Sequence, residues 1–318
     1  VTQGSANWGD YDNDGDLDVL ITGSNNSIIY RNNGDHTFTD IAAGLVAVSN
    51  STASWGDYDN DGDLDLALAG ISSTLSDTIT YIYKNTNGVF SKINTNIIGV
   101  TQGKVKWADL DNDGLLDLIV MGKSTPVANS ALTKVYLNGN SDSFVESDMV
   151  LPGAFYGDID LGDYDNDDDL DIVVSGYNIS NTYNTQLINI NTATPNNVPS
   201  APTNLQAIEN AGHIQLSWNK PTDSETPKNG LNYNIYVKKN DDTNYISSAN
   251  ADLSNGYRKI TKRGYINDSA TVIKNLKRGT YTWGVQAIDH SLAGSPFTTN
   301  TFTKANNAPV AVIGISPA

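Results

Sequence analysis

Four short stretches of this chain concentrate carboxylates densely enough to suggest metal chemistry. They are residues 10–18, 57–65, 109–117 and 163–171, and each has Asp at positions 1, 3, 5 and 9 of a nine-residue pattern. Like charges packed this closely repel one another unless a cation lies between them. The pattern therefore predicts one metal site in each stretch.

The ligand types favour calcium. Oxygen donors with no nearby sulfur or histidine suit this ion better than zinc or copper. We expect carboxylates from positions 1, 3, 5 and 9 and the backbone carbonyl of position 7, for up to four Ca²⁺ ions. The predicted ligands are Asp10, Asp12, Asp14, Asp16, Asp18, Asp57, Asp59, Asp61, Asp63, Asp65, Asp109, Asp111, Asp113, Leu115, Asp117, Asp163, Asp165, Asp167, Asp169 and Asp171.

Position 6 should close each loop. Gly15, Gly62 and Gly114 can adopt positive φ without a Cβ clash. The fourth stretch has Asp168 there. Asp tolerates the left-handed region at some conformational cost, so we expect the fourth site to be the weakest.

Short strands are predicted on both sides of each loop. The apolar runs Val19–Ile21, Leu66–Leu68, Leu118–Val120 and Ile172–Val174 follow the four stretches and are typical of buried strands. An EF-hand is excluded because position 12 is Ile21, Leu68, Val120 or Val174, not Glu. Simple solvated turns are the alternative interpretation, but four copies in one register favour metal binding.

The stretches belong to a longer repeat. Their first aspartates are 47, 52 and 54 residues apart, a period typical of propeller blades. Each repeat is predicted to be strand, calcium loop, strand, loop, strand, turn, strand, and the repeats should pack face to face as blades. Trp8, Trp55 and Trp107 each precede a loop by two residues. We interpret them as core between blades, with carbohydrate stacking as the alternative.

The repeated Trp-Gly-Asp-Tyr-Asp-Asn-Asp-Gly-Asp-Leu-Asp motif resembles the FG-GAP (VCBS-type) repeats of integrin alpha-subunit heads and of many bacterial secreted proteins. The resemblance covers residues 1–194 and implies an all-β propeller, usually of seven blades, with calcium loops between the first two strands of a blade. Only four motifs occur here. Further blades therefore either precede Val1, which we favour, or lack the motif and lie outside this chain.

A second all-β domain is predicted after a proline-rich linker at 195–202. Alternating patterns at 204–208, 213–218, 231–237, 270–273 and 280–288 indicate a β-sandwich over 203–304. The Ser-Ala-Pro-Thr-Asn-Leu opening, Trp218 and Tyr281 resemble a fibronectin type III domain. That resemblance implies a hydroxyl-to-backbone bond from Tyr281, while the insert between Lys239 and Ser269 departs from the family pattern. Residues 305–318 are expected to be a linker or the start of a further module.

The overall charge of −17 comes from the four stretches. They contain 20 of the 36 Asp and Glu residues, and the other 16 are balanced by 19 Lys and Arg. The chain therefore lacks the basic face that nucleic-acid binding needs. It has no cysteine and no apolar run long enough to insert into a membrane.

These features predict an extracellular, secreted or cell-surface protein, because calcium loops of this kind suit millimolar calcium. No nucleophile elbow, phosphate loop or catalytic cysteine is present, and the three histidines lie in unrelated contexts. We expect no enzymatic activity, but adhesion or binding of a protein or glycan ligand. The alternative is a set of carbohydrate-binding accessory modules of a secreted polysaccharide-degrading enzyme, with further domains of the polypeptide at both ends.

Overall fold

A computed structural model describes residues 3–125, 130–180, 182–190, 194–210 and 212–305. These residues form strands joined by loops and turns, with no helix among them. None of the described segments is therefore a helix of the length and apolar character that crossing a membrane requires. The predicted further module at 305–318 lies outside the described residues except for Ala305.

The first part of the chain folds into four similar antiparallel units. Unit 1 contains β1 (Ser5–Gly9), β2 (Asp18–Gly23), β3 (Asn26–Asn32) and β4 (Phe38–Asp40), and unit 2 contains β5 (Val48–Gly56), β6 (Asp65–Ser72), β7 (Thr78–Thr86) and β8 (Val89–Lys92). Unit 3 contains β9 (Thr101–Ala108), β10 (Asp117–Lys123), β11 (Ala131–Asn138) and β12 (Phe144–Glu146). Unit 4 contains β13 (Phe155–Gly162), β14 (Asp171–Tyr177) and β15 (Tyr183–Ile188). The predicted strand order is present, and among the described residues only unit 4 lacks its fourth strand.

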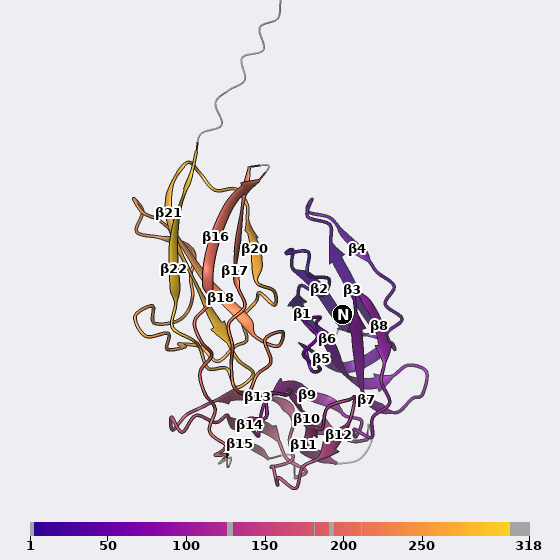
Figure 1. The fold of residues 1–318 in the computed structure, drawn as a ribbon. Coiled ribbons are helices and arrows are strands. Elements are labelled where there is room, and N and C mark those ends of the chain that lie inside the picture. The colour runs from indigo at the N-terminus through magenta and orange to yellow at the C-terminus, as the bar shows by residue number, and fades with distance from the viewer. Residues whose placement is uncertain (1–2, 126–129, 181, 191–193, 211, 306–318) are drawn as a thin grey trace, which may run out of the picture.

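The hydrophobic cores lie between successive units. Leu66 and Leu68 of β6 pack toward unit 1, whereas Ala67 and Ala69 of the same strand pack toward unit 3. The second strand of unit 3 is likewise buried on both faces. Burial on both faces explains why these strands appear in the sequence as continuous apolar runs. The units therefore pack as blades, although the described residues form no closed ring (Figure 1).

One prediction about the tryptophans is wrong. Trp107 is buried and stacks on Tyr58 of the preceding unit, with ring centroids 5.9 Å apart. Trp55 is partly buried and lies against Gly9 of unit 1. Trp8, however, is 62% exposed, because among the described residues no unit precedes unit 1 to cover it.

The second part of the chain is a sandwich of two antiparallel sheets. One sheet has the order β16 (Thr203–Asn210), β17 (His213–Asn219), β20 (Ala270–Ile273), and the other has the order β19 (Tyr245–Ser247), β18 (Asn232–Lys239), β21 (Gly279–Ile288), β22 (Thr298–Lys304). Trp218, Tyr233 and Trp283 pack together in its core. All five predicted strands are present, while β19 and β22 were not predicted.

Figure 1 shows how the two parts are arranged. The four units follow one another along an arc, and the sandwich stands over units 3 and 4, across from unit 1.

The hydroxyl of Tyr281 donates to the carbonyl of Lys277 at 2.6 Å, which is the hydroxyl-to-backbone bond expected for this residue.

Candidate metal centres in the aspartate loops

The stretches 10–18, 57–65, 109–117 and 163–171, here called loops 1 to 4, each join the first two strands of a unit. The position-1 carboxylate folds the loop around itself. In loop 1, Asp10 accepts hydrogen bonds from the backbone amides of Asp14 at 3.1 Å and Gly15 at 3.0 Å. The same pair of bonds forms in the other loops, at Asp57, Asp109 and Asp163.

Two residues of each loop adopt left-handed backbone. Position 6 has φ of 88°, 98° and 83° at the three glycines and 69° at Asp168, as the sequence predicted. Position 4 is also left-handed, at Asn13, Asn60, Asn112 and Asn166. Asn is one of the few non-glycine residues that enters this region readily. Four asparagines at one position were the signal in the sequence, and we did not predict their role.

The position-9 carboxylate joins the loop to the third strand. In loop 2, Asp65 accepts from the backbone amides of Tyr58 at 3.0 Å and of Asn85, in β7, at 2.8 Å. Equivalent bonds hold Asp18, Asp117 and Asp171. The site is therefore built from three strands rather than from the loop alone.

The position-3 aspartates supply the clearest evidence for a cation. The Oδ1 atoms of Asp12, Asp59 and Asp111 are buried and have no hydrogen-bond partner. A buried carboxylate oxygen without a partner is costly, and a bound cation would remove that cost. These residues therefore fit a metal ion.

In every loop, three aspartates each place one oxygen within 4.8 Å of the others, an arrangement that could hold a metal ion. The triplets are Asp10, Asp12 and Asp18; Asp57, Asp59 and Asp61; Asp109, Asp111 and Asp117; and Asp163, Asp165 and Asp171.

The remaining predicted ligands have other partners. At position 5, Asp14 accepts from the amide of Asp16 at 2.8 Å, which orders the backbone leading to position 7. At position 7, the Asp16 side chain pairs with Lys274 at 2.5 Å and that of Asp63 accepts from the amide of Asn87 at 2.7 Å. These side chains lie outside the triplets, so position 7 can offer its carbonyl whether it is Asp or Leu115.

Burial raises the pKa of several carboxyls in loops 1 to 3 strongly. The pKa of Asp10, Asp57 and Asp109 rises to about 7, and that of Asp65 to about 9, with neighbouring carboxylates adding to the effect of burial. A cation bound among them would favour the ionised forms and reverse these shifts. The sites are thus destabilised when they are both ionised and empty.

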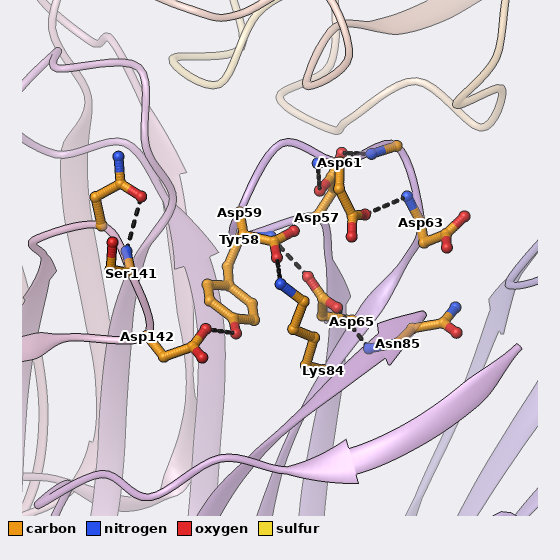
Figure 2. A network of polar contacts seen from close by, with 12 residues as sticks. Asp57, Tyr58, Asp59, Asp61, Asp63, Asp65, Lys84, Asn85, Ser141 and Asp142 are labelled. Atoms are coloured by element: carbon orange, nitrogen blue, oxygen red, sulfur yellow. Dashed lines mark hydrogen bonds and ion pairs between the residues drawn. The ribbon is translucent and has the colours of Figure 1, made fainter. Parts of the chain in front are cut away.

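Loop 2 has an additional cation of its own. Figure 2 shows Lys84 reaching from β7 to the carboxylate of Asp59, with the other aspartates of the loop nearby. Burial raises the pKa of Asp61, and the positive charge of Lys84 opposes that rise. The network continues through the hydroxyl of Tyr58, which donates to Asp142 of unit 3 at 2.5 Å (Figure 2).

Adjacent loops are linked by the position-4 asparagines. The side-chain amide of Asn13 donates to the carbonyl of Gly62 at 3.2 Å, and that of Asn60 donates to the carbonyl of Gly114, also at 3.2 Å. Asn112 donates in turn to the carbonyl of Asp168 at 3.3 Å. Each bond reaches position 6 of the next loop, so the four loops form one chain of contacts.

The sandwich contacts the same loops. Beyond the Lys274 pair with loop 1, His290 Nδ1 lies 3.0 Å from the carbonyl of Gly114 and Ser291 donates to Asn112 Oδ1 at 2.7 Å. In the segment that leads to the sandwich, the backbone amide of Asn196 donates to the carbonyl of Asp168 of loop 4 at 3.3 Å. Burial lowers the pKa of His290 well below its ordinary value.

Comparison with known proteins supports the repeat architecture. Residues 10–68 and 57–120 match the family model described as FG-GAP-like repeat. The fold and loops thus define an all-β protein with FG-GAP-like repeats that pack like propeller blades. No curated protein matches the chain.

Two solved structures are similar to parts of this chain. One is an Agrocybe aegerita lectin that recognises non-reducing terminal N-acetylglucosamine; it is 21% identical with a TM-score of 0.37, and the match covers 57% of this chain and 50% of the lectin. The other is a fungal alcohol oxidase of the AA5 family in complex with copper, 11% identical with a TM-score of 0.42, covering 93% of this chain and 63% of the oxidase. Both matches are too weak to inform function.

Proposed function

We propose that the four loops bind calcium and that the chain is a non-catalytic, extracellular or cell-surface protein whose repeats serve adhesion or ligand binding. The observation that carries the proposal is the repeated carboxylate triplet, together with the buried, unpartnered Oδ1 atoms in loops 1 to 3. All-oxygen ligands at this spacing favour calcium.

In this proposal the ion is structural. It neutralises carboxylates that burial alone disfavours, and it orders the loop that joins the first two strands of each unit. Because the loops form only in the folded units, calcium that binds there stabilises the folded state.

The sandwich is proposed to be a fibronectin type III-like spacer. Its three-stranded and four-stranded sheets and the bond from Tyr281 to the backbone support this assignment. In this role it fixes the orientation of the repeats relative to the rest of the polypeptide.

Carbohydrate binding is the second candidate function, and one surface feature favours it. The strands of unit 4 expose three tyrosines, Tyr156, Tyr177 and Tyr183, at 55%, 41% and 60%. Aromatic side chains left in solvent beside one another commonly mark binding surfaces.

Metal counting combined with thermal melts tests the calcium proposal. We expect four ions per chain and three in Asp111→Asn. A site saturated at 100 times its Kd contributes about 2.7 kcal/mol, so Asp111→Asn should lower the Tm of the repeats by several degrees in calcium. In chelator it should not lower the Tm, since it removes a buried unpaired charge.

Asp148→Asn is the matched control, because it makes the same charge change at an exposed position outside the loops. It should bind four ions and melt as the wild type does. No bound metal, with melts that calcium leaves unchanged, would show that the loops are solvated turns.

A further inference from the structure

The aspartate loops follow the end of the first strand of each unit. A small pocket lies at the opposite end of these strands. Four residues, each seven positions before the first Asp of its loop, line it: Gln3, Asn50, Gln102 and Tyr156. Its volume is about 220 Å³. Because the four units contribute the same register position, the pocket is formed by the packing of the units and not by any one of them.

All four of these residues have left-handed backbone, with φ of 52°, 48°, 55° and 50°. None is glycine, so the conformation carries strain at Gln3, Gln102 and Tyr156, whereas Asn50 adopts it more readily. Strained backbone is often retained where a side chain must be aimed at a ligand. Part of the strain also serves packing between units, since the carbonyl of Gln3 accepts from the amide of Ser51 at 3.0 Å.

The chemistry of the pocket is polar and nearly neutral. Gln3, Asn50 and Gln102 contribute amides, and Ser51 and Thr52 contribute hydroxyls. The Oε1 atom of Gln102 is buried without a hydrogen-bond partner. Lys104 is the only charged residue lining the pocket, and it lies 3.7 Å from Asp158. Such a lining suits a ligand rich in hydroxyl groups rather than an ion.

A row of aromatic rings leads outward from the pocket across unit 4. The ring of Tyr156 lies 5.3 Å from that of Phe155, Phe155 lies 6.2 Å from Tyr177, and Tyr177 lies 5.7 Å from Tyr183. Tyr177 and Tyr183 face each other across β14 and β15.

The row is specific to unit 4. The cross-strand pair at the equivalent register is Ile71 and Thr78 in unit 2, and Lys123 and Ala131 in unit 3. The repeat therefore does not require tyrosines at this register, and among the described residues no further unit covers them.

We propose that this pocket and the tyrosine row form a binding site for a neutral saccharide. The apolar face of a sugar ring stacks on exposed tyrosines, and its hydroxyl groups pair with the amide side chains of the pocket. The inference rests on the ligand-binding role proposed above and assigns that role to a surface free of the predicted metal ligands.

The test is a glycan array probed with the full chain in calcium, with neutral, uronic-acid and sulfated glycans, followed by titration with the best soluble neutral oligosaccharide. Tyr183→Ala should weaken binding about tenfold or more, since central aromatic contacts dominate such interfaces. Gln102→Asn, which shortens the amide but tolerates positive φ, should weaken it as well.

Tyr257→Ala is the matched control, because Tyr257 is 63% exposed and lies in the sandwich. Its variant should bind as the wild type does. No binding to neutral glycans, a preference for charged glycans, or binding that survives both Tyr183→Ala and Gln102→Asn would overturn the proposal. Calcium counting on the same samples is a separate measurement, so a failed metal assignment is distinguishable from a failed saccharide site.

Discussion

At the scale of single residues, the side chain beside position 3 differs among the loops. The position-9 carboxylate of each loop accepts a hydrogen bond from a backbone amide at or just after the end of the third strand. The residues directly before these amides in units 1 to 4 are Arg31, Lys84, Leu137 and Asn189. Lys84 pairs with Asp59, and Asn189 donates to Asp165 at 2.6 Å, whereas Leu137 brings no charge or donor. This position can therefore set how much negative charge each loop leaves for its ion.

Replacing Lys84 with leucine, the residue of unit 3, should have opposite effects with and without calcium. In chelator the variant should melt at a lower temperature, because the ammonium that partly neutralises loop 2 is gone. The association constant for calcium at loop 2 should rise about tenfold, because the ion no longer meets a nearby positive charge. Calcium titration and melts measure both effects.

Lys92→Leu provides the control for charge. It removes an exposed lysine of β8 in the same unit, one that lies over the ring of Tyr81 and outside the loop. It should leave calcium affinity unchanged. If Lys84→Leu destabilises the repeats both in calcium and in chelator, or stabilises them in both, the competition between Lys84 and the ion is contradicted.

At the scale of the elements, the loops are coupled. The position-4 asparagine of one loop fixes the carbonyl of position 6 in the next, directly before the position-7 carbonyl that we expect to bind the ion. The geometry of each site thus depends on the loop before it. Loop 1 lies at the start of this chain of contacts, and its link to loop 2 also includes Asn13 to Asp63 at 3.1 Å.

Asn13→Gly removes this link while keeping the left-handed backbone. Two hydrogen bonds of about 0.5–1.5 kcal/mol each are lost, so calcium affinity should fall and the repeats should melt a few degrees lower. Isothermal titration and calorimetry measure these changes. Asn25→Gly makes the same substitution at another left-handed residue, in the turn between β2 and β3, and should leave calcium affinity as it is. Equal effects of the two variants would show that the loops bind independently.

At the scale of the whole molecule, the sandwich packs directly against the aspartate loops and is not held only by the connecting segment. Its contacts reach loop 1 through Lys274 and loop 3 through His290 and Ser291. Near loop 2, Gly230 lies so close to Asn60 that an added Cβ would be 1.9 Å from its Oδ1. Ordering of the loops by calcium should therefore also fix the position of the sandwich.

Gly230→Ala should separate the two parts without unfolding either. Its φ does not require glycine, and the nearest atoms that the methyl group would meet belong to the side chains of Asn60 and His290. We expect a larger radius of gyration by small-angle scattering and faster proteolysis within 194–202. Gly139→Ala, whose Cβ would meet nothing closer than 3.6 Å, is the control. A scattering curve unchanged by Gly230→Ala would contradict the seating described here.

Much of the fold could be predicted from the sequence because it depends on contacts within one repeat. A loop that closes between positions 1, 5 and 6 is encoded in nine residues, and the strands beside it are encoded in the apolar runs. The same holds for the five predicted strands of the sandwich, which the alternation of apolar and polar residues indicates. The strands β19 and β22 carry no clear alternation, and they were missed.

Residues at the same position of the repeat can have different surroundings, and only the tertiary structure showed which of them do. Trp8 and Trp107 occupy one register position, yet burial depends on a neighbouring unit that covers only the second. Asn13 and Gly62 are 49 residues apart, and His290 and Gly114 are 176 apart, so no local spacing encodes their contacts. The sequence by itself thus determined the aspartate loops and the carboxylates that they bring together. The packing of the units determined the links between the loops, the seat of the sandwich and the pocket at the far end, because each is formed by residues that only folding brings together.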